Sequence, residues 1–130
     1  MTENQTLVSE FEQGRAPGAF HHADHVRVAF AYVSELPLLD AVAKFSAALQ
    51  RFAAAKNKPN LYHQTITWAY MFLINERIAR AGGQRSWEEF AERNQDLLVW
   101  KGGVLGELYR KETIDSDVAR HTFVLPDRTS

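Results

Sequence analysis

The chain contains no cysteine among its 130 residues. Without cysteine there are no disulfide scaffolds, no thiolate zinc sites, no cysteine-held iron–sulfur clusters and no thiol nucleophiles. The chain also lacks a charge imbalance, because 15 Lys and Arg residues oppose 16 Asp and Glu residues. Proteins that bind duplex nucleic acid usually carry a basic excess, so we expect no nucleic acid as a partner.

Long hydrophobic runs are missing as well. The longest apolar run covers residues 68–74, which is far short of the roughly 18 uncharged residues that a membrane-spanning helix needs. The N-terminal residues show no basic start followed by an apolar stretch, as a secretory signal would. We therefore expect a cytoplasmic protein with no membrane partner.

The composition that remains is that of a folded protein. Hydrophobic residues make up 45% of the chain and charged residues 24%, which argues against intrinsic disorder. A chain of 130 residues is long enough to build one domain with its own core. We expect a single helical domain over residues 1–130.

Apolar residues recur at spacings of three and four, the pattern of helices that bury one face. This pattern predicts a short first helix around residues 7–11, a second from His22, a third from Pro37 to Ala55, and a fourth from Leu61 to Ala81. The fourth is apolar on nearly every side, which is typical of a central helix. The expected fold class is all-α, a compact bundle of about four main helices plus short C-terminal helices.

Several residues mark the expected helix ends. Asn60 is a favoured N-cap for the fourth helix, and Gly82-Gly83 is a typical stop after it. Ser86 with Glu89 forms a capping box that opens a short helix. The cluster at 115–117 resembles a cap that starts a last helical turn.

Three of the five histidines lie in one pentapeptide, at positions 21, 22 and 25. On a helix, residues three or four apart share a face, so His21 with His25, or His22 with His25, are candidate metal ligand pairs. The segment also matches the letters of an inverted zinc-protease motif, with Asp24 in the Glu position. That match carries little weight, because Asp is one methylene shorter. The competing interpretation is a simple helix start, in which Asp24 favours the dipole and a histidine caps exposed amides.

A second polar group lies on the fourth helix. His63, Thr67 and Tyr70 share one side of it, and buried polar groups need partners. They either line a polar pocket or bond to one another and to the backbone. Trp68 and Phe72 are expected to bury the opposite side, so that Phe72→Ala costs roughly 3–5 kcal/mol and Thr67→Val impairs ligand binding more than folding.

The C-terminal residues offer two guanidinium groups. Arg120 or Arg128 is a candidate clamp for an anionic ligand, through the planar fork of the guanidinium. The competing interpretation is a tail that packs on the bundle and ties its charges to surface partners.

Several common motifs do not occur. No Glu precedes a His by three residues, which excludes a di-iron carboxylate bundle. The chain has neither a Walker-type phosphate loop nor a Gly-x-Ser-x-Gly elbow. Glu76 points away from His63 on the fourth helix and is expected to pair with Arg80, four residues on.

Three segments together carry a resemblance to a known group of proteins. They are residues 20–27 (FHHADHVR), 61–69 (LYHQTITWA) and 123–128 (FVLPDR). The chain resembles a family of small bacterial proteins of similar length that have no assigned activity. The likeness covers most of the chain and implies a compact bacterial cytosolic protein, but it supplies no catalytic residues.

Two hypotheses follow for the function. In the first, the protein binds a metal or small molecule, and acts as an enzyme, in a pocket between the second and fourth helices. Its metal ligands would be His22, His25 and His63, with a divalent transition metal as cofactor. Without a metal, His25 or His63 would act as general base, and Thr67, Tyr70 and Arg120 would bind the substrate.

The second hypothesis is a non-catalytic helical interaction or dimerisation module. The chain has 15 aromatic residues, counted as 3 Trp, 4 Tyr and 8 Phe, which could exceed what one core hides. Trp87, Trp100 and Tyr109 would then form a partner surface, and a homo-oligomer would be one outcome.

Overall fold

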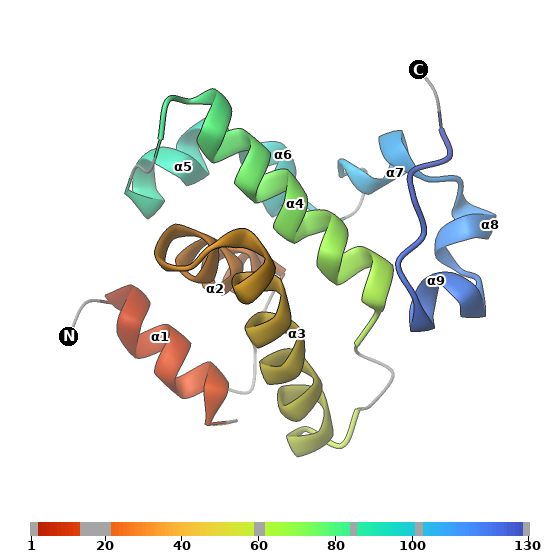
Figure 1. Cartoon of the computed structure of the whole chain (residues 1–130), viewed down its shortest axis with the longest axis horizontal. Coiled ribbons are helices and arrows are strands. Elements are labelled where there is room, and N and C mark those ends of the chain that lie inside the picture. Colours follow the sequence, from red (N-terminus) through yellow and green to blue (C-terminus); the bar gives the residue numbers. More distant parts are fainter. Residues whose placement is uncertain (1–2, 14–21, 59–61, 84–85, 101–102, 129–130) are drawn as a thin grey trace.

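The computed structural model describes residues 3–13, 22–58, 62–83, 86–100 and 103–128. Over these ranges every regular element is a helix, and no strand occurs. The all-α fold class predicted from the sequence is therefore confirmed, with the longer helices packed together and the last short helices of the chain at one side of them (Figure 1). None of the described helices is both long enough and apolar enough to cross a membrane.

Four longer helices form the body of the fold. They are α1 (Glu3–Glu12), α2 (His22–Glu35), α3 (Leu38–Ala55) and α4 (Gln64–Arg80). Helix α2 packs against α1, α3 and α4, and α3 also contacts α1 and α4 (Figure 1). The short breaks between these helices favour such neighbouring packing, as expected for a bundle.

Five short helices follow the body. They are α5 (Trp87–Arg93), α6 (Gln95–Leu98), α7 (Leu105–Leu108), α8 (Lys111–Ile114) and α9 (Asp117–His121). Helix α6 packs against α2, and α9 packs against α4. The single turns α6 and α8 were not predicted, because four residues are too few to show a helical repeat of apolar positions.

Most predicted helix ends agree with the structure. The Ser86 hydroxyl accepts from the amide of Glu89 at the start of α5, and Ser116 caps α9 in the same way. Gly82 and Gly83 end α4 with φ values of 90° and 128°, which only glycine adopts readily.

The start of α4 differs from the prediction. The helix begins at Gln64 rather than Leu61, and its N-cap is His63, whose Nδ1 accepts a hydrogen bond from the Ile66 amide. Asn60, the predicted cap, lies outside the described residues. Histidine is not a favoured N-cap, so residue preferences alone pointed to the wrong cap.

The core is a continuous cluster of aromatic and aliphatic side chains from α1 to α6. At its centre, the fully buried Phe11 ring stacks on Phe45 and Phe52, with ring centroids 5.6 and 5.1 Å apart. Such a cluster fastens the short helix α1 to α3, because aromatic pairs add to the free energy of burial.

Helix α4 has two different sides. Trp68 and Phe72 lie on one side, where both contact Phe123 of the C-terminal segment at ring distances of 5.8 and 5.5 Å. Both are only partly buried, whereas Met71 and Ile74 are fully buried. The predicted aromatic side exists, but it lies under the C-terminal segment rather than in the deep core.

Hydrogen bonds also fasten the C-terminal segment to α4. The buried hydroxyl of Thr65 donates to the carbonyl oxygen of Thr122 at 2.8 Å and accepts from the amide of Val124 at 3.0 Å. The hydroxyl of Tyr109 donates to the Val124 carbonyl oxygen at 2.6 Å. The extended backbone at 122–124 is not paired in a sheet, and these side chains supply its hydrogen-bond partners instead.

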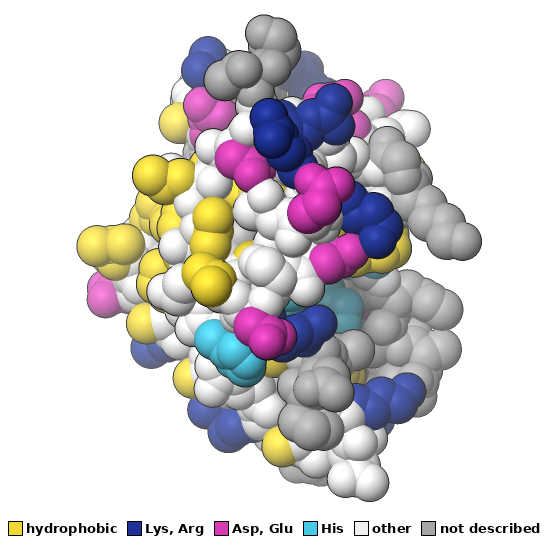
Figure 2. Space-filling model, turned by 90° about the vertical axis from the view of Figure 1, so that its right-hand side faces the viewer, with side chains coloured by type: hydrophobic (Ala, Val, Ile, Leu, Met, Phe, Trp, Pro, Cys, Tyr) yellow, Lys and Arg dark blue, Asp and Glu magenta, His cyan; other side chains and the backbone are white. Residues whose placement is uncertain are grey.

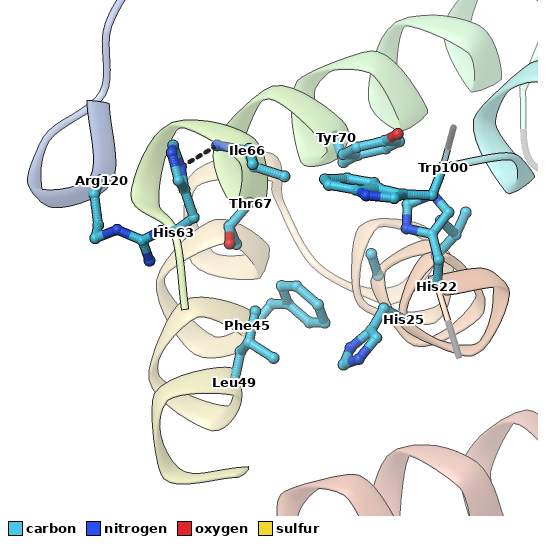
Figure 3. A pocket seen from close by; sticks show the side chains of 12 residues that line it. His22, His25, Phe45, Leu49, His63, Ile66, Thr67, Tyr70, Trp100 and Arg120 are labelled. Carbon is cyan, nitrogen blue, oxygen red and sulfur yellow. Dashed lines mark hydrogen bonds between the residues drawn. The ribbon is translucent and has the colours of Figure 1, made fainter. Parts of the chain in front are cut away.

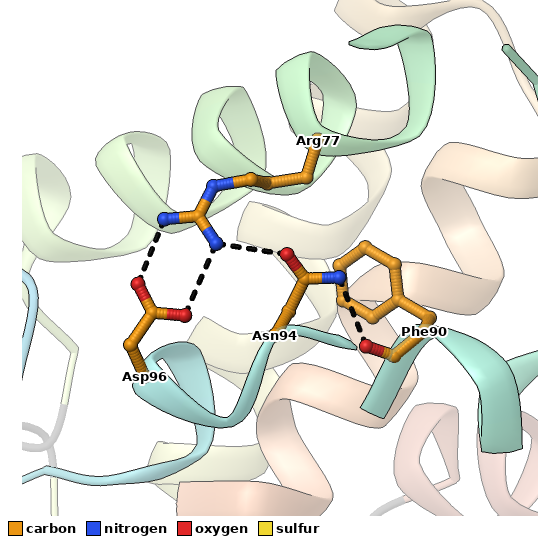
Figure 4. Close-up of polar contacts among 4 residues, drawn as sticks. All are labelled: Arg77, Phe90, Asn94 and Asp96. Atoms are coloured by element: carbon orange, nitrogen blue, oxygen red, sulfur yellow. Dashed lines mark hydrogen bonds and ion pairs between the residues drawn. The ribbon is translucent and has the colours of Figure 1, made fainter. Parts of the chain in front are cut away.

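A polar cluster fastens the other end of α4 to α5 and α6 (Figure 4). The Arg77 guanidinium donates to both Asp96 carboxylate oxygens, at 3.0 and 2.8 Å, and to Asn94 Oδ1 at 2.8 Å. Asn94 in turn donates to the Phe90 carbonyl oxygen at 2.9 Å. The hydrogen bonds from Arg77 lower the pKa of Asp96, as a bidentate pair should.

We expect Met71→Ala to lower the free energy of unfolding by about 2–5 kcal/mol, because it truncates a fully buried side chain. Phe72→Ala should cost less than Met71→Ala, since the Phe72 ring is partly exposed. The partial exposure of Phe72 therefore lowers the loss of stability that the sequence predicted for Phe72→Ala. Urea denaturation of both variants measures the order, and a larger loss in Phe72→Ala would show that the C-terminal contact, rather than the deep core, dominates stability.

Candidate functional site

A cavity of about 480 Å³ lies among α2, α3, α4 and α9 (Figure 3). The lining residues come from α2, from α3, and from the N-cap and first two turns of α4. One further residue follows α6, and one lies on α9. These are His22, His25, Val26, Ala29, Phe45, Leu49, His63, Ile66, Thr67, Tyr70, Trp100 and Arg120.

The structure brings six of the predicted site residues to this one cavity: His22, His25, His63, Thr67, Tyr70 and Arg120. Three histidines of the cavity come from α2 and from the N-cap of α4, and Thr67, Tyr70 and Arg120 also line it. His21 lies outside the described residues, so its predicted pairing with His25 has no structural description. The cavity also takes in residues that the sequence did not single out for a site, chiefly Phe45 and Leu49. Their regular spacing on α3 signalled only a buried face.

His63 has a structural role in this arrangement. Its Nδ1 accepts from the Ile66 amide at 3.1 Å, and its Nε2 lies 2.8 Å from the Ile114 carbonyl oxygen, to which it must donate. Both ring nitrogens are therefore engaged and the ring is neutral, in keeping with a pKa that burial lowers. A metal or a proton at Nδ1 would break the cap of α4, which argues against His63 as metal ligand or general base.

The predicted metal site lacks a preformed ligand set. Within the parts of the chain that the structure describes, no three His, Cys, Asp or Glu side chains form a group able to hold a metal ion. His22 and His25 remain a pair on one helix, three residues apart, but the geometry gives them no third imidazole without releasing His63.

His25 sits in an aromatic environment. Its ring makes edge contacts with Phe11 and Phe52, at centroid distances of 6.1 and 5.8 Å. Burial, reinforced by the neighbouring His22, lowers its pKa to about 4. His25 is therefore neutral at pH 7, and its low basicity makes it a poor general base.

Among the described residues, only one ring nitrogen of His22 has a hydrogen-bond partner. Its Nε2 lies 2.9 Å from the Leu97 carbonyl oxygen, to which it donates. That hydrogen bond sets the tautomer and leaves the lone pair on Nδ1. The ring packs against Tyr70 and Trp100 at centroid distances of 5.0 and 5.2 Å. Burial lowers the pKa of His22, so this imidazole is a neutral acceptor at pH 7.

Two hydroxyl groups on α4 belong to side chains that are more than nine-tenths buried. Thr67 is 7% exposed, and no hydrogen bond joins its hydroxyl to another described residue. Tyr70 is 6% exposed, and its hydroxyl likewise has no partner among these residues. Burial raises the pKa of Tyr70 to about 12, so the phenol stays protonated. The buried hydroxyl of Tyr70, which has no partner among the described residues, costs free energy and calls for an explanation.

Arg120 brings a positive charge to one end of the cavity (Figure 3). Its Nη1 donates to the carbonyl oxygen of Tyr62 at 3.1 Å, which holds α9 against the start of α4. Arg128, the other candidate clamp, instead donates to the Gly106 carbonyl oxygen outside the cavity. The structural interpretation of the tail thus fits Arg128.

The aromatic residues predicted to form a partner surface differ in their surroundings. Tyr109 is 2% exposed, and Trp87 packs on Phe30 and Phe90. Trp100 is 52% exposed and lies at the cavity, against His22. The prediction that Tyr109 lies on a partner surface is therefore wrong, and Trp100 belongs to the cavity.

Comparison with protein-family models, with curated proteins and with solved structures finds no match for this chain. The resemblance to a family of small bacterial proteins thus stays a prediction, and the geometry of the cavity is the basis for any functional proposal.

The buried histidines predict acid sensitivity. The unfolded chain protonates His25 at its ordinary pKa of 6.5, whereas the folded protein does so only at about 4. As the pH falls from 6.5 towards 4, protons bind the unfolded state preferentially, and the free energy of unfolding should fall by about 3 kcal/mol through His25 alone. The lowered pKa values of His22 and His63 act in the same direction.

Chemical denaturation at a series of pH values measures this dependence. His25→Leu should flatten it, while the same change at the exposed His121 on α9 should leave it as in the wild type. If the stability of His25→Leu changes with pH as much as that of the wild type, the proposed role of His25 in the acid sensitivity is wrong.

Proposed function

We propose that the protein binds a small organic molecule in the cavity between α2 and α4. The observation that carries this proposal is the cavity itself, which combines apolar walls with a few converging polar groups. This combination is typical of ligand sites, in which apolar walls supply affinity and a few polar groups orient the ligand.

The size of the cavity supports a ligand site over a packing defect. Protein cores contain few voids larger than a water molecule, whereas ligand pockets measure about 300–1,000 Å³. The volume of about 480 Å³ equals that of roughly 16 water molecules at about 30 Å³ each. A molecule of a dozen or so non-hydrogen atoms therefore fits.

A specific observation favours catalysis as a second candidate. The Leu97 carbonyl oxygen orients the His22 ring and leaves Nδ1 as an acceptor, the arrangement that a general base requires. Tyr70, a protonated phenol, packs against that ring. If the protein is an enzyme, we propose His22 as its base in place of His25 and His63. A metal-dependent reaction has less support, because His63 would have to release the α4 cap.

The interaction-module hypothesis rests on a different face. Figure 2 looks onto the side built by α7 to α9 and the C-terminal segment, where apolar side chains gather apart from the charged ones. Val118 and Leu125 are 63% and 73% exposed. Scattered exposed apolar residues are common on monomeric proteins, so this face supports a partner less strongly than the cavity supports a ligand.

Blocking the cavity should abolish binding. Leu49 lines the cavity, whereas Leu39 on the same helix is 75% exposed. We expect 1-naphthylacetamide, a neutral aromatic probe of 14 non-hydrogen atoms, to bind with a Kd on the order of 1 mM or lower. Leu49→Trp should weaken binding at least tenfold, and Leu39→Trp should leave it unchanged.

Ligand-observed NMR with all three proteins measures these affinities, and thermal melting checks that each variant is folded. Equal binding to Leu49→Trp and wild type, or no binding to any of the three, would contradict the proposal.

A further inference from the structure

The cavity has one electropositive corner. Arg120 of α9 reaches it and donates to the carbonyl oxygen of Tyr62, immediately before the cap residue of α4. The 17-residue helix α4 starts at this corner, and its N-terminus carries a partial positive charge. A guanidinium has five N–H donors, so it can donate to a ligand in addition to protein groups such as the Tyr62 carbonyl oxygen.

Thr67 adds a second polar group at the same corner. Its side chain points into the cavity on the Arg120 side, one turn after His63 (Figure 3). It is 7% exposed, and its hydroxyl makes no hydrogen bond to any described residue. A helical threonine often bonds to the carbonyl four residues earlier, and no such bond is made by Thr67, so its hydroxyl is open to a group in the cavity. A ligand oxygen would supply the missing partner.

The charge balance of the lining favours an anion. Among the described lining residues, Arg120 alone carries a permanent charge, and none is Asp or Glu. The three imidazoles are neutral at pH 7 and add no second cation. One guanidinium matches one carboxylate in a planar, bidentate geometry, whereas a doubly charged phosphate would call for more donors.

Away from this corner the walls are apolar and rich in rings. Phe45, Tyr70 and Trp100 surround the far part of the cavity, with Ile66 and Leu49 between them and Arg120. Flat aromatic groups pack well against such side chains.

We infer that the ligand is an aromatic carboxylic acid whose carboxylate binds Arg120 and the Thr67 hydroxyl, with its ring among Phe45, Tyr70 and Trp100. This inference rests on the proposed function and names the class of molecule that the cavity takes. The acid head lies at the start of α4, and the ring lies towards His22 and Trp100.

Calorimetric titration of the wild-type protein at pH 7 with three matched probes tests this inference. The probes are 1-naphthylacetate, the neutral 1-naphthylacetamide and the cationic 2-(1-naphthyl)ethylamine. We expect the acid to bind about tenfold or more tightly than the amide, because a hydrogen bond to a charged group is stronger than one to a neutral group. The amine should bind more weakly than both.

Variants locate the acid group. Arg120→Gln should remove the preference for acid over amide and leave the amide affinity within about threefold. Thr67→Val keeps the side-chain shape and should reduce the preference severalfold. Arg128→Gln, a change of the same kind outside the cavity, should leave the preference intact. If Arg120→Gln does not fold, the three wild-type titrations and Thr67→Val still decide the matter.

The outcomes separate this inference from the proposed function. Equal binding of acid and amide, or tighter binding of the amine, would overturn the anion site while leaving the cavity as a ligand site. A preference that survives in both Arg120→Gln and Thr67→Val would move the acid group to another part of the cavity. Failure of all three probes to bind would contradict the proposed function as well.

Discussion

The two hydrogen bonds of His63 are the constraint on which the rest of the site depends. One ring nitrogen caps α4, and the other donates to the carbonyl oxygen of Ile114, 51 residues further along the chain. This imidazole therefore joins the start of the central helix to the short C-terminal helices. Because Arg120 follows shortly after Ile114 and donates to Tyr62, the same junction brings a positive charge to the end of the cavity. Thr65, two residues after His63, strengthens the junction through its hydrogen bonds to Thr122 and Val124.

The three histidines of the cavity thus have three different roles. His63 builds the wall, His25 lies between phenylalanine rings as a neutral and weakly basic group, and His22 offers a nitrogen to a ligand. Burial lowers all three pKa values, so the cavity holds neutral imidazoles next to one guanidinium. The cavity is suited to an apolar molecule with one acidic group, and His22 and Tyr70 would face its other end.

The sequence alone predicted the four longer helices. The spacing of apolar residues reveals one buried face in each of the first three, and the fourth is apolar on nearly every side. Helical spacing grouped His22 with His25, and His63 with Thr67 and Tyr70, but it linked neither group to the other or to Arg120. The hypothesis of one site joined them. The roles of the histidines could not be predicted in the same way. The tautomer of His22 depends on the carbonyl oxygen of Leu97, 75 residues away, and no local pattern encodes such a contact. Trp100 belongs to the cavity for a similar reason, since α6 carries it to His22.

The central claim is that His63 supports the cavity while His22 faces the ligand. Long-range proton–nitrogen NMR of the imidazoles at pH 7, recorded before and after addition of 1-naphthylacetate, tests this claim most directly. We predict that His63 and His22 are both neutral and protonated at Nε2. Addition of the acid should shift the Nδ1 resonance of His22 and leave that of His63 in place. A His63 ring that carries its proton on Nδ1, or that responds to the acid while His22 does not, would contradict the account.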